Sequence, residues 1–175
     1  LCYGNSAVIT YQGDDAGTRA PNTHNARVWH LQNGTTLSAT DATGVNDGTI
    51  VGTVTAASGQ IAGGANFVTT GNNDITVPNS NSLNISEKLT MSAWVFQPSR
   101  NTNYSIVFQK RAPTADNPMD YGLLLDPTGH PVFQFALIGG IYTTCTATGA
   151  VPLSTWTYVT VTIDESAGTV VHFYL

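Results

Sequence analysis

The chain has 175 residues, of which 41% are hydrophobic and 10% are charged, with a formal net charge of −5 and a pI near 5.0. Its six Lys and Arg residues are scattered, so the basic clusters on which nucleic-acid binding depends are missing. No apolar run approaches the roughly 20 residues of a membrane helix, and no signal peptide is visible, so we expect neither a nucleic-acid partner nor a membrane span.

The first 26 residues predict an N-terminal extension, with one short strand at 7–11 followed by a loop rich in Gly, Asp, Asn and Thr. From residue 27 to 175 we expect one domain. A strand at 27–31 precedes a long irregular stretch, 33–64, after which strand patterns recur at short intervals. They are predicted at 65–69, 74–77, 89–97, 104–110, 121–126, 132–137, 141–146, 157–164 and 169–175.

None of these segments shows the 3.6-residue apolar period of a helix. Many short strands separated by turn sequences such as DPTGHP and DESAGT are typical of an all-β sandwich or barrel. The long loops favour a jelly roll over a simple meander. We therefore predict a two-sheet antiparallel jelly-roll sandwich.

Alternation along two strands predicts which side chains reach the core. In LTMSAWVFQ, one face carries Leu89, Met91, Ala93 and Val95, and the other carries Thr90, Ser92, Trp94 and Phe96. In TYVTVTID, the apolar face carries Val159, Val161 and Ile163. Such alternation is typical of an antiparallel sheet that has one face on the core and one face toward water.

Several stretches in order resemble a known family. They are VWHLQNG, DATGVNDGTIVG, the run from GGANF through DITVPN to LTMSAWV, and STWTYVTVTIDESAGTVVHFYL. Together they resemble the laminin-G-like, concanavalin A-like jelly-roll domains of bacterial secreted proteins over residues 27–175. The stretch YGNSA at 3–7 resembles the tail of a bacterial domain of unknown function that often precedes them. The resemblance implies the lectin/glucanase type of sandwich and a secreted or cell-surface protein.

The pattern departs from this family at the C-terminus. Members of the family continue past a segment like HFYL with further strands, so we expect a domain that lacks the usual C-terminal strands. Its last strand would then leave an open sheet edge, which is a template for another chain. We hypothesise that the protein forms a homo-oligomer through this edge.

Catalysis is not expected. Glycoside hydrolysis needs two carboxyl groups roughly 5–10 Å apart, and glucanases of this fold carry them at alternate positions of one strand. The two glutamates, Glu87 and Glu165, fall in a connection and in a turn, and no G-x-S-x-G motif is present. The missing carboxylate pair argues against a glycosidase.

If the protein binds a metal ion, calcium is more plausible than a metal held by histidines, because the loops are rich in side-chain oxygen atoms. Asp41, Asn46 and Asp47 lie in DATGVNDG, Asp74 ends GNND, and Asp164 is the middle residue of IDE. The resemblance adds that related jelly rolls often hold a structural calcium between such a loop and a strand end. The alternative is that these side chains form Asx turns with backbone N–H groups. Both interpretations stay open.

A sugar ring offers one apolar face and hydroxyl edges, so its site needs an aromatic surface with polar groups beside it. Near loops, Tyr104 and Tyr142 are the best candidates for that surface, with Asn101, Asn103 and Gln109 as polar partners. Trp94, Phe96, Trp156 and Tyr158 are further candidates for that surface. Large aromatic residues dominate sandwich cores, however, so packing inside is the favoured interpretation for three tryptophans: Trp29, Trp94 and Trp156.

We therefore predict a non-catalytic recognition module whose partner is a glycan or, for adhesion, a cell-surface or matrix protein. The alternative is a structural or assembly module that self-associates through its open edge and has no small ligand. Cys2 and Cys145 are far apart in sequence and could form one disulfide, which the sequence alone does not indicate.

Overall fold

The computed structural model describes residues 27–31, 36–61, 63–85, 88–111, 119–136, 142–166 and 168–175. Within these ranges the chain forms eleven β-strands and one short 3-10 helix, η1 (Asn81–Leu83), with no α-helix, which confirms the all-β prediction. Among the described residues, no helix has the length and hydrophobicity to cross a membrane. The chain divides into two compact units, Leu1–Leu83 and Asn84–Leu175.

The first unit contains two antiparallel strand pairs. β1 (Thr49–Val51) pairs with β4 (Asp74–Thr76), and β2 (Val54–Ser58) pairs with β3 (Gly63–Phe67). The prediction of one irregular stretch at 33–64 was wrong, because β1 and β2 lie inside it. Neither is long enough to show a clear alternation, and each forms by pairing with a strand that follows it in the chain.

The predicted strands near the N-terminus have different outcomes. At 27–31 the structure has a single bridge, between Trp29 and Asp41, instead of a strand. The predicted strand at 7–11 lies outside the described residues, as does the whole of the predicted 1–26 extension. Cys2 lies there too, while Cys145 is half-buried on the ninth strand, so the disulfide stays a prediction.

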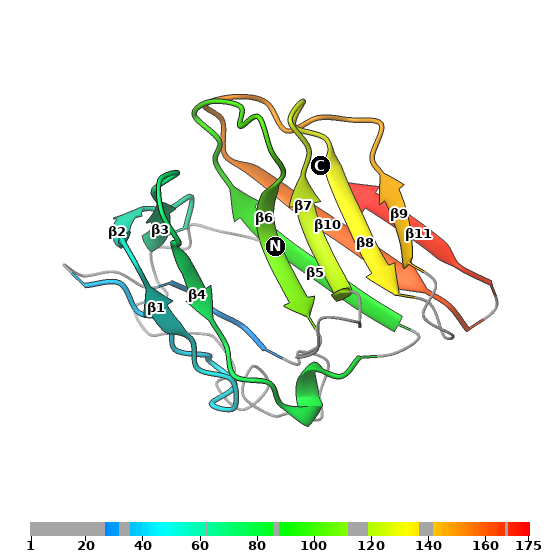
Figure 1. Ribbon diagram of the computed structural model, residues 1–175, viewed down its shortest axis with the longest axis horizontal. Helices are drawn as coiled ribbons and strands as arrows, with labels where there is room; N and C mark the ends of the chain where they lie inside the picture. The colour runs from blue at the N-terminus through cyan, green and yellow to red at the C-terminus, as the bar shows by residue number, and fades with distance from the viewer. Residues whose placement is uncertain are drawn as a thin grey trace, which may run out of the picture. The chain divides into compact units, whose positions relative to one another are not determined.

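The second unit is the sandwich (Figure 1). One sheet has the order β11-β10-β5, and the other has the order β6-β7-β8-β9, with every neighbouring pair antiparallel. The bounds lie within a few residues of the predicted ones: β5 (Lys88–Val95), β6 (Ser105–Arg111), β7 (Met119–Leu125), β8 (Pro131–Ala136), β9 (Tyr142–Thr146), β10 (Thr157–Asp164) and β11 (Val170–Tyr174).

The core of this unit lies between the two sheets. From the three-stranded sheet, Met91, Val159, Val161 and Ile163 are buried, as the alternation predicted. From the four-stranded sheet come Tyr121, Leu123, Leu125, Phe133 and Phe135. The rings of Phe133 and Phe135 stack with their centroids 5.1 Å apart. Burial of this apolar surface is the main force that holds the sheets face to face.

Three connections meet at one end of this sandwich, which we call the loop end (Figure 1). They are the β5–β6, β7–β8 and β9–β10 connections. Backbone hydrogen bonds join them: Val151 N donates to Gly129 O at 2.9 Å, and Ser154 N donates to Gln97 O at 2.9 Å. The loop end is therefore a bonded structure and not a set of independent loops.

Candidate functional site

Aromatic rings line the face of β5 and β10 that points away from the core. Tyr158 lies directly opposite Trp94 in the register, and their ring centroids are 5.2 Å apart at an interplanar angle of 49°. One step closer to the loop end, Phe96 and Trp156 repeat the arrangement at 5.4 Å and 48°. Trp94 is 39% exposed, Phe96 44% and Tyr158 47%. We call these four residues the aromatic pairs.

Hydroxyl groups continue the same face beyond the aromatic pairs. Thr160 lies between Ser92 on β5 and Tyr174 on β11, and the Tyr158 hydroxyl donates to Ser92 Oγ at 2.8 Å. The next row is Thr90, Thr162 and His172. With a rise of about 3.4 Å per residue, the rows from residue 96 to residue 90 span roughly 20 Å. We call the aromatic pairs and these two rows the outer face.

The outer face ends at an ion pair. Lys88 Nζ lies 3.0 Å from Asp164 Oδ2, and both side chains are largely exposed. The hydroxyl of Ser166, its backbone N–H and then the Lys88 ammonium lower the pKa of Asp164 to about 2. Asp164 therefore stays ionised at neutral pH, and its charge is matched by that of Lys88.

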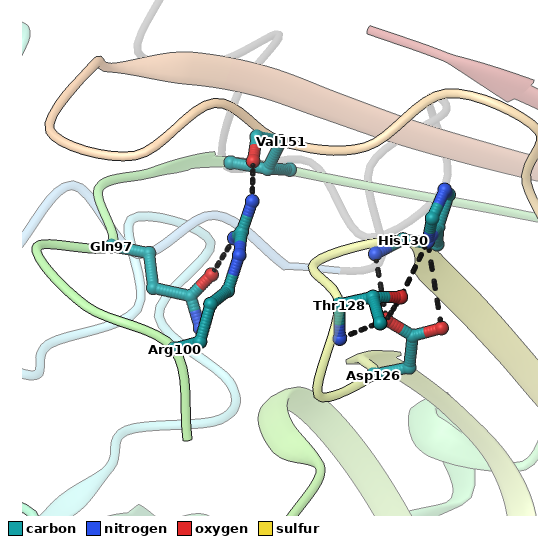
Figure 2. Close-up of polar contacts among 6 residues, drawn as sticks. All are labelled: Gln97, Arg100, Asp126, Thr128, His130 and Val151. Atoms are coloured by element: carbon teal, nitrogen blue, oxygen red, sulfur yellow. Dashed lines mark hydrogen bonds and ion pairs between the residues drawn. The ribbon is translucent and has the colours of Figure 1, made fainter. Parts of the chain in front are cut away.

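Arg100 ties the loop end together (Figure 2). Its guanidinium donates to Gln97 Oε1 and to the Val151 carbonyl oxygen, the latter at 2.6 Å. It also packs against Gly129, where a Cβ atom would overlap the guanidinium. Gly129 has a φ of +92°, a conformation that glycine adopts without strain. One side chain thus links all three connections at this end.

The β7–β8 turn is organised by Asp126 (Figure 2). Its Oδ1 accepts hydrogen bonds from Thr128 N at 2.8 Å, the Thr128 hydroxyl at 2.7 Å and His130 N at 2.9 Å. Burial alone would raise the pKa of Asp126, but these bonds and the nearby His130 ring outweigh it and lower that pKa. The DPTGHP sequence was predicted as a hairpin turn, and this is confirmed.

The structure brings together three of the five predicted ligand residues. Asn101, Asn103 and Tyr104 lie in the β5–β6 connection at the loop end, where Tyr104 is 51% exposed. Asn101 Nδ2 donates to Ser105 Oγ at 2.7 Å. Gln109 lies further along β6, opposite Gly122. Tyr142 begins β9, but its side chain lies outside the described part.

The prediction that Trp94 packs in the core was wrong. Alternation from Met91 already places residue 94 on the outer face, and the structure leaves it exposed there. Trp156 is half-buried and packs against Phe96. Trp29 is also half-buried and donates from Nε1 to the Asn46 carbonyl oxygen at 3.0 Å. The signal for the outer face was therefore present in the sequence, as aromatic residues at alternate positions of two strands.

Asp41 was the first of the predicted calcium ligands, and its carboxylate is almost completely buried. Its Oδ1 accepts from the backbone N–H groups of Val28 and Thr43, and its Oδ2 accepts from the Thr43 hydroxyl and the Asn46 N–H. Burial alone would raise the pKa of Asp41, but these bonds lower it. Four acceptor positions of one carboxylate are thus filled from within the chain.

The other predicted calcium ligands also have internal partners. Asn46 Oδ1 accepts from Ser80 Oγ at 2.5 Å, Asp47 Oδ1 accepts from the Asp41 N–H at 2.8 Å, and Asp74 Oδ1 accepts from Thr76 Oγ1 at 2.7 Å. No group of three or more His, Cys, Asp or Glu side chains suited to a metal occurs among the described residues. As they stand, these residues do not fit a calcium ion, and the calcium site stays a prediction.

The family comparison covers every strand of the sandwich. The family model described as laminin G, of the concanavalin A-like lectin/glucanases superfamily, matches residues 69–175, which is more than half of the chain. The matched range includes every strand of the second unit and thus the whole outer face. Among curated proteins, none matches this chain.

Proposed function

Because the chain belongs to the concanavalin A-like lectin/glucanases superfamily, we propose that it is a non-catalytic recognition module that binds a glycan on its outer face. The observation that carries this proposal is the pairing of three exposed rings and one half-buried ring: Trp94 with Tyr158, and Phe96 with the half-buried Trp156. Large aromatic side chains normally stabilise a fold by being buried, so a cluster left open to water is typical of a binding surface.

The chemistry of the outer face suits a sugar. Aromatic rings contact the apolar face of a pyranose, and hydroxyl groups beside them accept and donate hydrogen bonds to its edges. Ser92, Thr160 and Thr162 supply these hydroxyls on rows next to the aromatic pairs. A protein partner would suit the exposed rings, but it would not need hydroxyl rows of this kind.

The family description names lectins, which bind glycans, and glucanases, which hydrolyse them. Of these two activities, binding without catalysis is the better supported here. A glycosidase needs two carboxyl groups across the scissile bond. Among the described residues of the outer face, the acidic group is Asp164, which is engaged by Lys88 and Ser166. Laminin-G-like domains are usually extracellular, and secretion or display at the cell surface is part of the proposal.

Affinity electrophoresis of the full chain through gels of soluble polysaccharides tests this proposal. We expect one or more polysaccharides to retard the protein, and Trp94→Ala to weaken the retardation at least tenfold. Tyr104→Ala is the matched control, because Tyr104 is an exposed aromatic at the loop end. Loss of binding in Tyr104→Ala alone would move the site to the loop end, and retardation by none of the polysaccharides would reject the proposal. Release of reducing ends would contradict its non-catalytic part.

A second candidate is assembly through the edge of the three-stranded sheet. In the described part of the chain, β11 pairs only with β10, and Val170 and Tyr174 are exposed. A strand edge of this kind pairs readily with another chain. Light scattering over a wide concentration range would detect the oligomer. Val170→Lys with Tyr174→Lys should dissociate it, whereas Thr162→Lys on the central strand should not.

A further inference from the structure

We propose that the ligand of the outer face is a single linear chain of a neutral polysaccharide that lies along the strands and contacts several sugar units. This inference rests on the glycan-binding function proposed above. Three properties of the outer face carry it: its length, the tilt of its rings and its charge.

The length of the outer face exceeds what one sugar ring can cover. The aromatic pairs occupy the part nearest the loop end, and the hydroxyl rows extend the face to roughly 20 Å along the strands. On β11, Tyr174 adds a ring beside Thr160, in the first row beyond the aromatic pairs; it is 57% exposed, and its ring lies 6.4 Å from that of His172 in the next row. A short ligand held by the aromatic pairs would leave these groups unused, whereas a linear chain along β10 would reach them.

The tilt of the rings favours a single chain over a crystalline surface. Within each aromatic pair the two ring planes differ by 48° or 49°, so the rings cannot lie flat on one plane together. The β-sheet beneath them is twisted, which rotates each successive row against the last. A single polysaccharide chain can rotate from one sugar to the next and follow such a surface, and the flat face of a crystal cannot.

The charge of the outer face favours a neutral ligand. Acidic polysaccharides are held by Arg and Lys side chains that pair with carboxylate or sulfate groups. Within the described residues, the one Lys or Arg of these rows is Lys88, which is paired with Asp164. The protein as a whole carries a formal charge of −5. An acidic chain would meet net repulsion, whereas a neutral chain would meet rings and hydroxyls.

Calorimetry with oligosaccharides tests the length of the contact. The probes are neutral oligomers, cello-, xylo- and mannooligosaccharides of increasing length, with heparin and alginate as acidic comparators. We expect the affinity for the best series to rise at least tenfold from the disaccharide to the hexasaccharide. Thr162→Val with Tyr174→Ala should reduce hexasaccharide affinity at least fivefold more than it reduces disaccharide affinity, because these residues lie beyond the aromatic pairs. Trp156→Ala should weaken both.

The outcomes separate this inference from the proposed function. Equal affinity for the disaccharide and hexasaccharide, tighter binding of heparin or alginate, or binding to microcrystalline cellulose without binding to any soluble oligomer would each overturn the inference and leave the glycan-binding function standing. Binding to no glycan at all would overturn both. An equal loss of disaccharide and hexasaccharide affinity in the Thr162→Val, Tyr174→Ala double variant would also overturn the inference.

Discussion

The two faces of the β5–β10 strand pair share one backbone but differ in the size and the exposure of their side chains. Toward the core, Met91, Val159 and Val161 are at most 8% exposed, while on the outer face Trp94 and Tyr158 are 39% and 47% exposed. The larger side chains are thus the ones left in water. Their position is not required by packing, and the proposed glycan site depends on this observation.

The comparison teaches how to separate stability from function in this sandwich. Side chains on the inner face fill space between two sheets, so their removal leaves a cavity. Side chains on the outer face border on solvent, so the structure loses little when they are shortened. Substitutions on alternate residues of one strand should therefore fall into two classes.

The largest expected effect is on the inner face. Met91→Ala should lower the free energy of unfolding by about 2–5 kcal/mol, because it leaves a cavity against Val161 and its neighbours. Thr90→Ala, the adjacent residue on the outer face, should cost less than about 1 kcal/mol. Urea unfolding followed by tryptophan fluorescence measures both. Equal losses in the two variants would break the distinction between the faces.

The next largest loss of stability is expected at the loop end, where the β5–β6, β7–β8 and β9–β10 connections meet. Arg100→Ala removes the hydrogen bonds to Gln97 and Val151 and should cost about 1.5–3 kcal/mol, since the donor is charged. Arg100→Lys keeps the charge but loses the planar fork, so it should restore only part of the stability. Differential scanning calorimetry compares the two. Full stability in Arg100→Ala would show that the loop end is held by backbone bonds alone.

A smaller effect is expected from the outer face itself. Trp94→Ala should cost about 1–2 kcal/mol, mostly from the lost contact with Tyr158. This is less than the cost of Met91→Ala although tryptophan is the larger side chain. The same urea experiment measures it, with the denaturant slope expected to stay unchanged. A loss above that of Met91→Ala would place Trp94 in the core and remove the basis of the proposed site.

Lowering the pH should reduce the stability of the fold through Asp164, which lies at the far end of the outer face. The pKa of Asp164 is about 2 in the folded chain and about 3.9 in an unfolded one, so its ionised form favours folding. This contribution is complete above about pH 4 and is lost as the pH falls toward 2. Titration by NMR should find the low value, and Ser166→Ala should raise it, because the Ser166 hydroxyl is its main partner. A normal pKa in the unaltered chain would contradict the hydrogen bonding described here.

The smallest effect is expected from calcium. Since Asp41 and Asn46 already bond within the chain, adding calcium or EDTA should leave the melting temperature unchanged. A rise with calcium that EDTA reverses would show that the loop opens to take the ion, as the sequence pattern predicted. Asp47→Asn, at the exposed carboxylate of the same loop, would then reduce that rise.

Much of the sandwich was predictable because its strands alternate. The predicted strand at 157–164 has the bounds of β10. Of the inner residues of β5, Met91 is buried in the core and Leu89 and Val95 pack against it, as predicted. The short strands β1 and β2 were missed, since they lie in a Gly- and Thr-rich stretch that was interpreted as a loop, whereas β3 and β4, which are as short, were predicted. In the candidate site, Tyr104 was placed at a loop end, but Trp94 was assigned to the core because size was weighed above alternation.

By itself, the sequence determined the fold class and the two faces of the long strands, because a period of two in apolar residues admits few other structures. The tertiary structure alone decided which distant residues meet. Register places Tyr158 on Trp94, packing places Arg100 on Gly129, and a hydrogen bond joins the Val28 N–H to Asp41 Oδ1. These contacts join residues that lie apart in the chain, and a local pattern does not specify which partner each side chain finds.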